Sequence, residues 1–148
     1  PDWVVPLDSS KALAFETWAA KMVASEFASG AVISISQGKG KDRKGQETEQ
    51  VTVSFPPAVA SKTSRVYDYE VRAVAYLQDA DYEVAVRRVL STSFHLPPTQ
   101  ETKDIQTCVF ALKDLVGKGP IRFIVRPTEC YGNKGREIRS GLWEPATA

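Results

Sequence analysis

The spacing of apolar residues along the chain changes near residue 30. In residues 8–28, apolar side chains recur every three or four positions, among them Phe15, Trp18 and Met22. This spacing puts the three side chains on one face of a helix, and polar residues at the start of the segment can cap it. We therefore predict one α-helix over residues 8–28, ended by Gly30.

After Gly30, apolar and polar residues alternate, and many of the apolar ones are β-branched. Alternating runs bounded by Gly, Pro and Asp are typical of strands. Short strands with no helical pattern between them favour a Greek-key β-sandwich over a fold of alternating strands and helices. The predicted strands cover residues 31–36, 50–55, 66–76, 82–90, 105–112, 121–126 and 136–142.

We accordingly predict a mainly β fold, a seven-stranded Greek-key β-sandwich preceded by one α-helix. Residues 1–30 would be a helical connector, and residues 31–148 would be the sandwich. A length of 148 residues, 43% of them hydrophobic, suits one such core.

The charge balance and the apolar runs limit the classes of partner. The chain has 19 basic and 18 acidic residues, a formal net charge of +1, so its overall charge does not favour nucleic acid. Its apolar runs are far shorter than the roughly 20 residues that a membrane span needs. The chain starts at Pro1 rather than at Met, and we expect it to be a processed product or a piece of a larger protein.

Residues 38–45, which contain three glycines and four basic residues, have the composition of a phosphate-binding loop. That motif then requires Lys and Ser or Thr, where this chain has Gln46 and Glu47, and a predicted strand follows in place of a helix. We expect a solvated hairpin loop, with an anion-binding or polymer-binding loop as the alternative. Four basic side chains would carry that binding: Lys39, Lys41, Arg43 and Lys44.

Other catalytic and metal-binding patterns are incomplete. His95 is the only histidine, too few for a His-rich metal centre, and the pair Asp79 and Asp81 lacks the spacing of a calcium loop. Cys108 and Cys130 do not fit a zinc site; we expect two buried thiols, with a disulfide between them as the alternative. We expect this chain to be no enzyme by itself and to need no cofactor.

Aromatic residues divide into two groups. Four tyrosines lie within predicted strands, and we expect them to pack in the core or on a sheet face: Tyr67, Tyr69, Tyr76 and Tyr82. Trp143 lies outside the well-defined elements. Together with Phe15, Trp18 and Met22 it is a candidate for contact with another domain, packing within this domain being the alternative.

Parts of the sequence resemble fibronectin type III domains. Residues 107–115, 121–126 and 129–135 resemble the E, F and G region, in which a leucine-containing turn leads into an alternating strand and then an aromatic-Gly-Asn turn. Residues 51–55 and 67–71 would be strands B and C. In this alignment Ile121 occupies the position where that family usually has a tyrosine.

A narrower resemblance involves residues 51–58, 67–71, 91–96 and 130–134, which look like the C-terminal sandwich domain of bacterial calcineurin-like metallophosphoesterases. The resemblance implies a non-catalytic accessory domain, secreted or in the cell envelope, whose partner is the catalytic domain of the same parent chain. The histidine-containing metal motifs of that family are missing here, since His95 stands alone. The alternative is an independent carbohydrate- or protein-binding module that uses loops at one end of the sandwich.

Overall fold

The computed structural model describes residues 25–59, 66–77, 80–92, 104–129 and 132–146. Within them the chain forms seven strands and one short 3₁₀ helix. Their bounds are β1 (Ser34–Lys41), β2 (Glu47–Phe55), β3 (Val66–Leu77), β4 (Ala80–Leu90), β5 (Gln106–Ala111), η1 (Leu112–Asp114), β6 (Ile121–Glu129) and β7 (Ile138–Arg139). No helix in this described part is long and apolar enough to cross a membrane.

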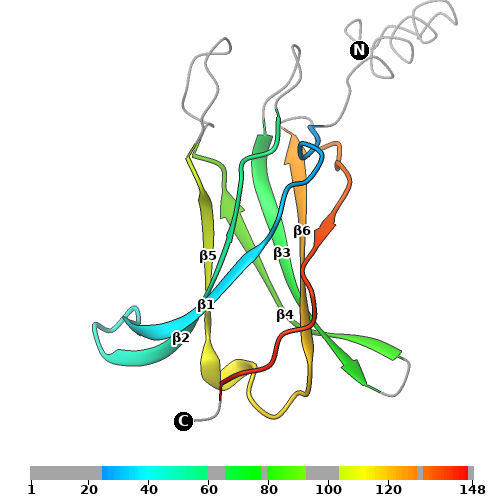
Figure 1. The fold of residues 1–148 in the computed structure, drawn as a ribbon. Helices are drawn as coiled ribbons and strands as arrows, with labels where there is room; N and C mark the ends of the chain where they lie inside the picture. The colour runs from blue at the N-terminus through cyan, green and yellow to red at the C-terminus, as the bar shows by residue number, and fades with distance from the viewer. Residues whose placement is uncertain (1–24, 60–65, 78–79, 93–103, 130–131, 147–148) are drawn as a thin grey trace, which may run out of the picture.

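The strands form two antiparallel sheets that pack face to face (Figure 1). One sheet has the order β1-β2-β5 and the other the order β4-β3-β6-β7. The chain crosses from one sheet to the other between β2 and β3, between β4 and β5, and between β5 and β6. The prediction of a mainly β fold with seven strands is therefore confirmed for the described residues.

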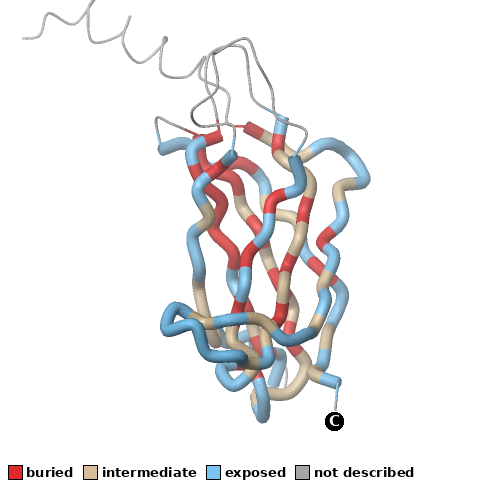
Figure 2. The backbone as a smooth tube through the Cα atoms, turned by 90° about the vertical axis from the view of Figure 1, so that its left-hand side faces the viewer, coloured by how far each residue is buried: buried red, intermediate tan, exposed pale blue. Residues whose placement is uncertain are grey.

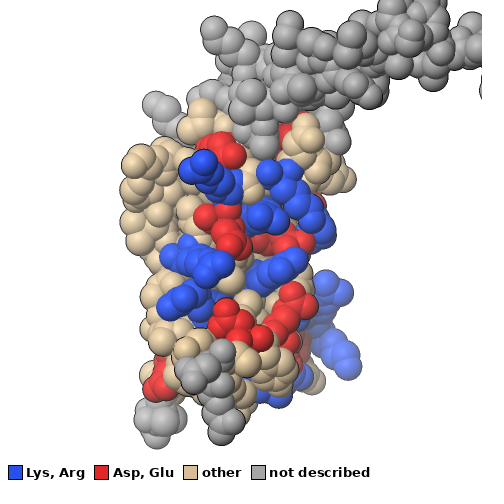
Figure 3. Space-filling view, turned by 90° about the vertical axis from the view of Figure 1, so that its right-hand side faces the viewer, with Lys and Arg blue, Asp and Glu red and all other residues tan. Residues whose placement is uncertain are grey.

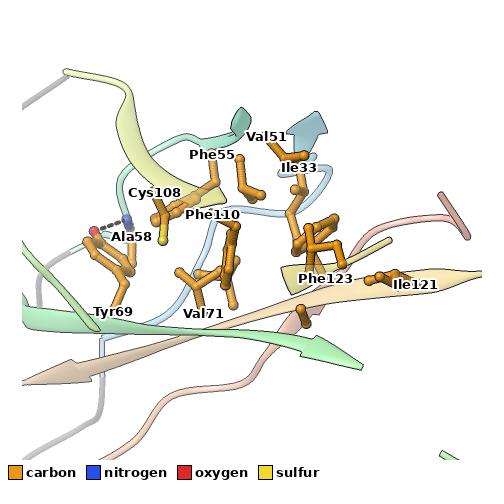
Figure 4. Close-up of a cluster of buried hydrophobic side chains, with 14 of the residues drawn as sticks. Ile33, Val51, Phe55, Ala58, Tyr69, Val71, Cys108, Phe110, Ile121 and Phe123 are labelled. Carbon is orange, nitrogen blue, oxygen red and sulfur yellow. Dashed lines mark hydrogen bonds between the residues drawn. The ribbon is translucent and has the colours of Figure 1, made fainter. Parts of the chain in front are cut away.

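The core lies between the sheets because alternate side chains of each strand point inward. Figure 2 shows this alternation of buried and exposed positions along the strands, and Figure 4 shows the inward side chains. Val51 and Phe55 of β2 face Tyr69 of β3 and Phe123 of β6, and all four are at most 1% exposed. Burying a side chain of this size stabilises the fold by about 1.5–3 kcal/mol.

Tyr69 combines packing with a hydrogen bond. Its ring lies edge-on to that of Phe55, with 4.9 Å between centroids, and its hydroxyl accepts a hydrogen bond of 2.9 Å from the backbone N–H of Ala58 (Figure 4). A buried hydroxyl without a partner would be costly, so this bond allows a tyrosine in the core.

Of the four tyrosines expected in the core or on a sheet face, Tyr69 lies in the core and the other three lie at the surface. Tyr67, Tyr76 and Tyr82 are 42%, 44% and 48% exposed. A register shift between Val66 and Asp68, where β3 pairs with β6, breaks the alternation and turns Tyr67 outward. Tyr76 and Tyr82 lie near the end of the β3–β4 hairpin, which extends beyond the core (Figure 1).

Two elements differ in extent from their predictions. β1 begins at Ser34 and runs through Gly38 and Gly40 to Lys41, so the first half of the expected loop is strand. The last strand is reduced to Ile138–Arg139, followed by one isolated bridge between Ile121 and Trp143.

The predicted helix lies mostly outside the described residues, which begin at residue 25. Residues 25–28, its last four, are not helical. Glu26 instead forms an antiparallel bridge with Val59, so a contact with the sandwich has replaced the final helical turn. Gly30 has a φ of 84°, a conformation that glycine adopts without strain, and it lies in the turn that leads towards β1.

Candidate functional site

The turn between β1 and β2 is fixed by Asp42. One carboxylate oxygen accepts hydrogen bonds from the backbone N–H groups of Lys44 and Gln46, each 2.9 Å long. Gly45, with a φ of 78°, completes the turn. These hydrogen bonds to Asp42 define the turn from which the side chains of Arg43 and Lys44 project.

An open groove of about 1110 Å³ lies beside this hairpin, and we call it the hairpin groove. It is lined by Lys41 and Arg43 of the hairpin, Val109 of β5, and Lys113 and Val116 of the segment after β5. Arg87 of β4 and Gln50 of β2 also line the groove.

Gly40 shapes the hairpin next to the groove. A Cβ atom at this position would collide with the side-chain amide of Gln50, which lies across the hairpin and donates a 3.2 Å hydrogen bond to the carbonyl oxygen of Lys41. The glycine therefore allows Gln50 to pack over β1.

The basic side chains of the groove are weakly paired. Lys41, Arg43 and Lys113 form no salt bridge with any described residue. Arg87 approaches Asp114 at 3.9 Å, and its guanidinium lies 5.6 Å from the centroid of the Phe110 ring. Asp42 and Glu49 also line the groove, so four cations face two carboxylates.

The four basic residues expected in a binding loop are only partly brought together. Lys41 and Arg43 line the groove, whereas Lys39 and Lys44 do not. Sequence reasoning missed Arg87 and Lys113, which come from β4 and from the segment after β5. No local pattern could have found them, because the pairing of β5 with β2 brings Lys113 to the hairpin and the packing of the two sheets brings Arg87.

Cys108 lies beneath this region and is a free, buried thiol. Burial raises its pKa to about 11, and the nearby positive charge of Arg87 opposes the rise. The expectation of a buried thiol is confirmed for Cys108, and the alternative disulfide is not formed. Cys130 lies outside the described residues.

A second candidate surface is the opposite end of the sandwich, where residues 25–28 dock. The carbonyl oxygen of Glu26 accepts a 2.8 Å hydrogen bond from the N–H of Val59, and its carboxylate accepts one of 2.7 Å from the N–H of Arg136. The ring of Phe27 lies 5.9 Å from that of Tyr69, measured between centroids. We call this set of contacts the N-terminal junction.

Gly135 makes the junction possible. A Cβ atom here would collide with the carbonyl oxygen of Ser25 and lie 3.0 Å from the ring of Pro127. Any larger residue would therefore push residues 25–28 away from β6, so the docked position depends on glycine at 135.

The predicted interdomain residues are tested only in part. Phe15, Trp18 and Met22 lie outside the described residues. Trp143 exchanges two backbone hydrogen bonds with Ile121, of 2.8 and 2.7 Å, and packs 5.8 Å from the ring of Phe123. It therefore packs within the sandwich. The side chain is only partly buried, and its contact with another domain stays a prediction.

The outer face of the four-stranded sheet carries a network of paired charges, beside which the Nε atoms of Arg122 and Arg126 are buried without a hydrogen-bond partner among the described residues. Glu70 accepts hydrogen bonds from Arg72 at 2.6 Å and from Arg88 at 3.1 Å, and Arg88 also reaches Asp68 at 3.1 Å. Figure 3 shows one face of the molecule on which basic and acidic side chains interleave. This network contrasts with the hairpin groove, where cations are in excess.

No cluster of three or more potential metal ligands is found among the described residues. His95 and Asp79 lie outside them. The described surfaces thus offer groups suited to binding, namely cations, amides and exposed apolar side chains.

Comparison with known proteins gives no match. No protein-family model fits the chain, and neither the curated proteins nor the solved structures give a significant similarity.

Proposed function

We propose that this chain is a non-catalytic accessory domain with a fibronectin type III-like fold, which holds a neighbouring domain of a larger phosphoesterase in a fixed orientation. The observation that carries the proposal is the N-terminal junction. A connector tied down by two hydrogen bonds and a partly buried ring loses much of its freedom to swing, which favours one orientation for a domain that precedes it.

The strand order supports the fold assignment. If β2 and β3 are strands B and C, and β5, β6 and β7 are E, F and G, the sheets read A-B-E and C′-C-F-G. The fourth strand then pairs with C rather than with E, unlike the constant-type immunoglobulin arrangement. Leu115, fully buried after η1, takes the place of the leucine in the E–F turn.

Ile121 departs from the family pattern, which leaves a divergent member of the family or another immunoglobulin-like sandwich as the alternatives. It stands where the family usually has a tyrosine, and it is fully buried and hydrogen-bonded through its backbone to Trp143. The Trp143 ring packs beside Phe123 at this position.

The parent phosphoesterase is tested most simply by the coding sequence upstream of Pro1. We expect it to encode a domain with several Asp and His metal-ligand motifs and an export signal, consistent with a secreted or cell-envelope protein. A start codon and signal peptide immediately before Pro1 would contradict the proposal.

The non-catalytic role is tested with the 148-residue chain itself. We expect no hydrolysis of a model phosphodiester when divalent metal ions are added. Metal-dependent hydrolysis by this chain alone would overturn the proposal, and polysaccharide binding abolished by one aromatic substitution would favour an independent carbohydrate-binding module instead.

A further inference from the structure

We propose that the hairpin groove binds an extended acidic peptide segment that also carries apolar side chains. The inference is independent of the proposed interdomain role, because the β1–β2 hairpin beside the groove and the docked residues 25–28 lie at opposite ends of the sandwich (Figure 1).

Charge is the first reason. Lys41 and Arg43 reach the groove from the hairpin, while Arg87 and Lys113 reach it from β4 and from the segment after β5. These are three separate segments of the chain, and three of the four cations have no salt-bridge partner among the described residues. Cations gathered in this way around a concave surface attract a partner of opposite charge.

Exposed apolar surface is the second reason. Val109 and Val116 are 46% and 53% exposed, and both line the groove. Covering them removes apolar surface from water, which favours an occupant with apolar groups of its own. A small anion would neutralise the cations and leave these valines exposed.

The shape favours a chain over a compact ligand. The groove, of about 1110 Å³, is open rather than enclosed, so its occupant can extend beyond it. β5, which contributes Val109, is an edge strand of its sheet. Edge strands have unpaired backbone N–H and C=O groups that an extended peptide can meet.

A neutral glycan is the less suitable occupant. Sugar-binding surfaces commonly stack Trp or Tyr side chains against the sugar rings, and no aromatic residue is among the described residues that line the groove. The apolar groups offered here are the aliphatic side chains of Val109, Leu112 and Val116, which suit peptide side chains.

The test is a fluorescence-anisotropy titration of the 148-residue chain with a labelled peptide of repeated Asp-Glu-Leu. Its comparison ligands are a Lys-Arg-Leu peptide, free glutamate and heparin. We expect saturable binding of the acidic peptide alone. If the acidic peptide does not bind, or if heparin binds and the peptide does not, the proposal is wrong.

Two double variants locate the binding. Replacing Lys41 and Arg43 by Glu is expected to weaken binding about tenfold or more, because both side chains line the groove. The same replacement of Lys39 and Lys44, on the same hairpin but outside the groove lining, is the matched control and is expected to change it less than about threefold at physiological salt. Equal losses would mean diffuse attraction to the hairpin and would overturn the proposal.

A pair of neutral variants tests the apolar contact. Val109→Thr is expected to weaken binding about threefold, since it adds a hydroxyl to a surface that the peptide covers. Val32→Thr is the control, because Val32 is 70% exposed and does not line the groove. Unchanged affinity for Val109→Thr would show that the peptide does not enter the groove. Circular dichroism of each variant confirms that it is folded.

Discussion

At the scale of single residues, several positions are explained by what surrounds them rather than by their own type. Asp42 serves its own turn, Gly40 makes room for Gln50, and Gly135 makes room for Ser25. The sequence alone marks the first as a turn residue, since Asp favours such bonds. It cannot reveal the roles of the two glycines, because the atoms that need the space belong to other segments. These atoms are the side-chain amide of Gln50, across the hairpin from Gly40, and the carbonyl oxygen of Ser25, beside Gly135.

Cys108 gives a prediction about pH. Its pKa is raised from 9.0 to about 11 by burial, so the folded state holds its proton at pH values where the unfolded chain releases it. The thiol therefore contributes stability that is complete below about pH 9 and is lost as the pH rises towards about 11, with a total on the order of 2–3 kcal/mol.

The measurement is the free energy of unfolding in urea at several values between about pH 8 and about pH 11. We expect a steeper loss for the wild-type chain than for Cys108→Ala, which lacks the titrating group. If the free energies of unfolding of the two proteins fall in parallel as the pH rises, the Cys108 thiol does not have the raised pKa that its burial predicts.

At the scale of elements, the alternation of apolar and polar residues predicted that a strand is present more accurately than it predicted where the strand begins and ends. Residues 66–76 and 50–55 were assigned correctly because β-branched and aromatic residues alternate there, and β3 and β2 contain them. The extension of β1 through Gly38 and Gly40 was missed, because glycine is disfavoured in strands and pairing with β2 overrides that preference. The bulge that exposes Tyr67 has no sequence signal of its own.

The polar outer face of β3 yields a prediction for the four-stranded sheet. The Glu70 side chain is 10% exposed and accepts hydrogen bonds from both Arg72 and Arg88. Glu70→Gln keeps the shape but removes the charge, and we expect a loss of about 1–3 kcal/mol in the free energy of unfolding.

Glu83→Gln is the matched control for that change. Glu83 is 52% exposed and lies 3.6 Å from Arg72, so its loss should cost no more than about 0.5 kcal/mol. Urea denaturation of both variants measures the difference. Equal effects of the two substitutions would refute the view that Glu70 is the centre of the network.

At the scale of the whole molecule, the two ends of the sandwich have different characters. One end holds residues 25–28 against β6 and the residues that follow β2, and the other presents the hairpin groove (Figure 1). The sequence indicated the sandwich, since seven alternating runs leave few other folds. It could not indicate the groove or the junction, because each is assembled from segments that meet only after the sheets pack.

This arrangement leaves both ends available at once. The N-terminal junction and the hairpin groove share no residue, so the proposed interdomain contact and the proposed peptide binding use different surfaces. On the outer face of the four-stranded sheet, by contrast, Arg88 forms salt bridges with both Asp68 and Glu70.

The docked junction is the central claim, and amide hydrogen exchange measured by NMR tests it most directly. The N–H groups of Val59 and Arg136 both donate to Glu26, so we expect each to exchange about a hundredfold or more slowly than in an unstructured peptide. In Gly135→Ala this protection should be lost while amides in the β3–β6 pair remain protected. Gly141→Ala is the control, since an added Cβ there meets no atom within 4 Å. Unprotected Val59 and Arg136 amides in the wild-type chain would contradict the account.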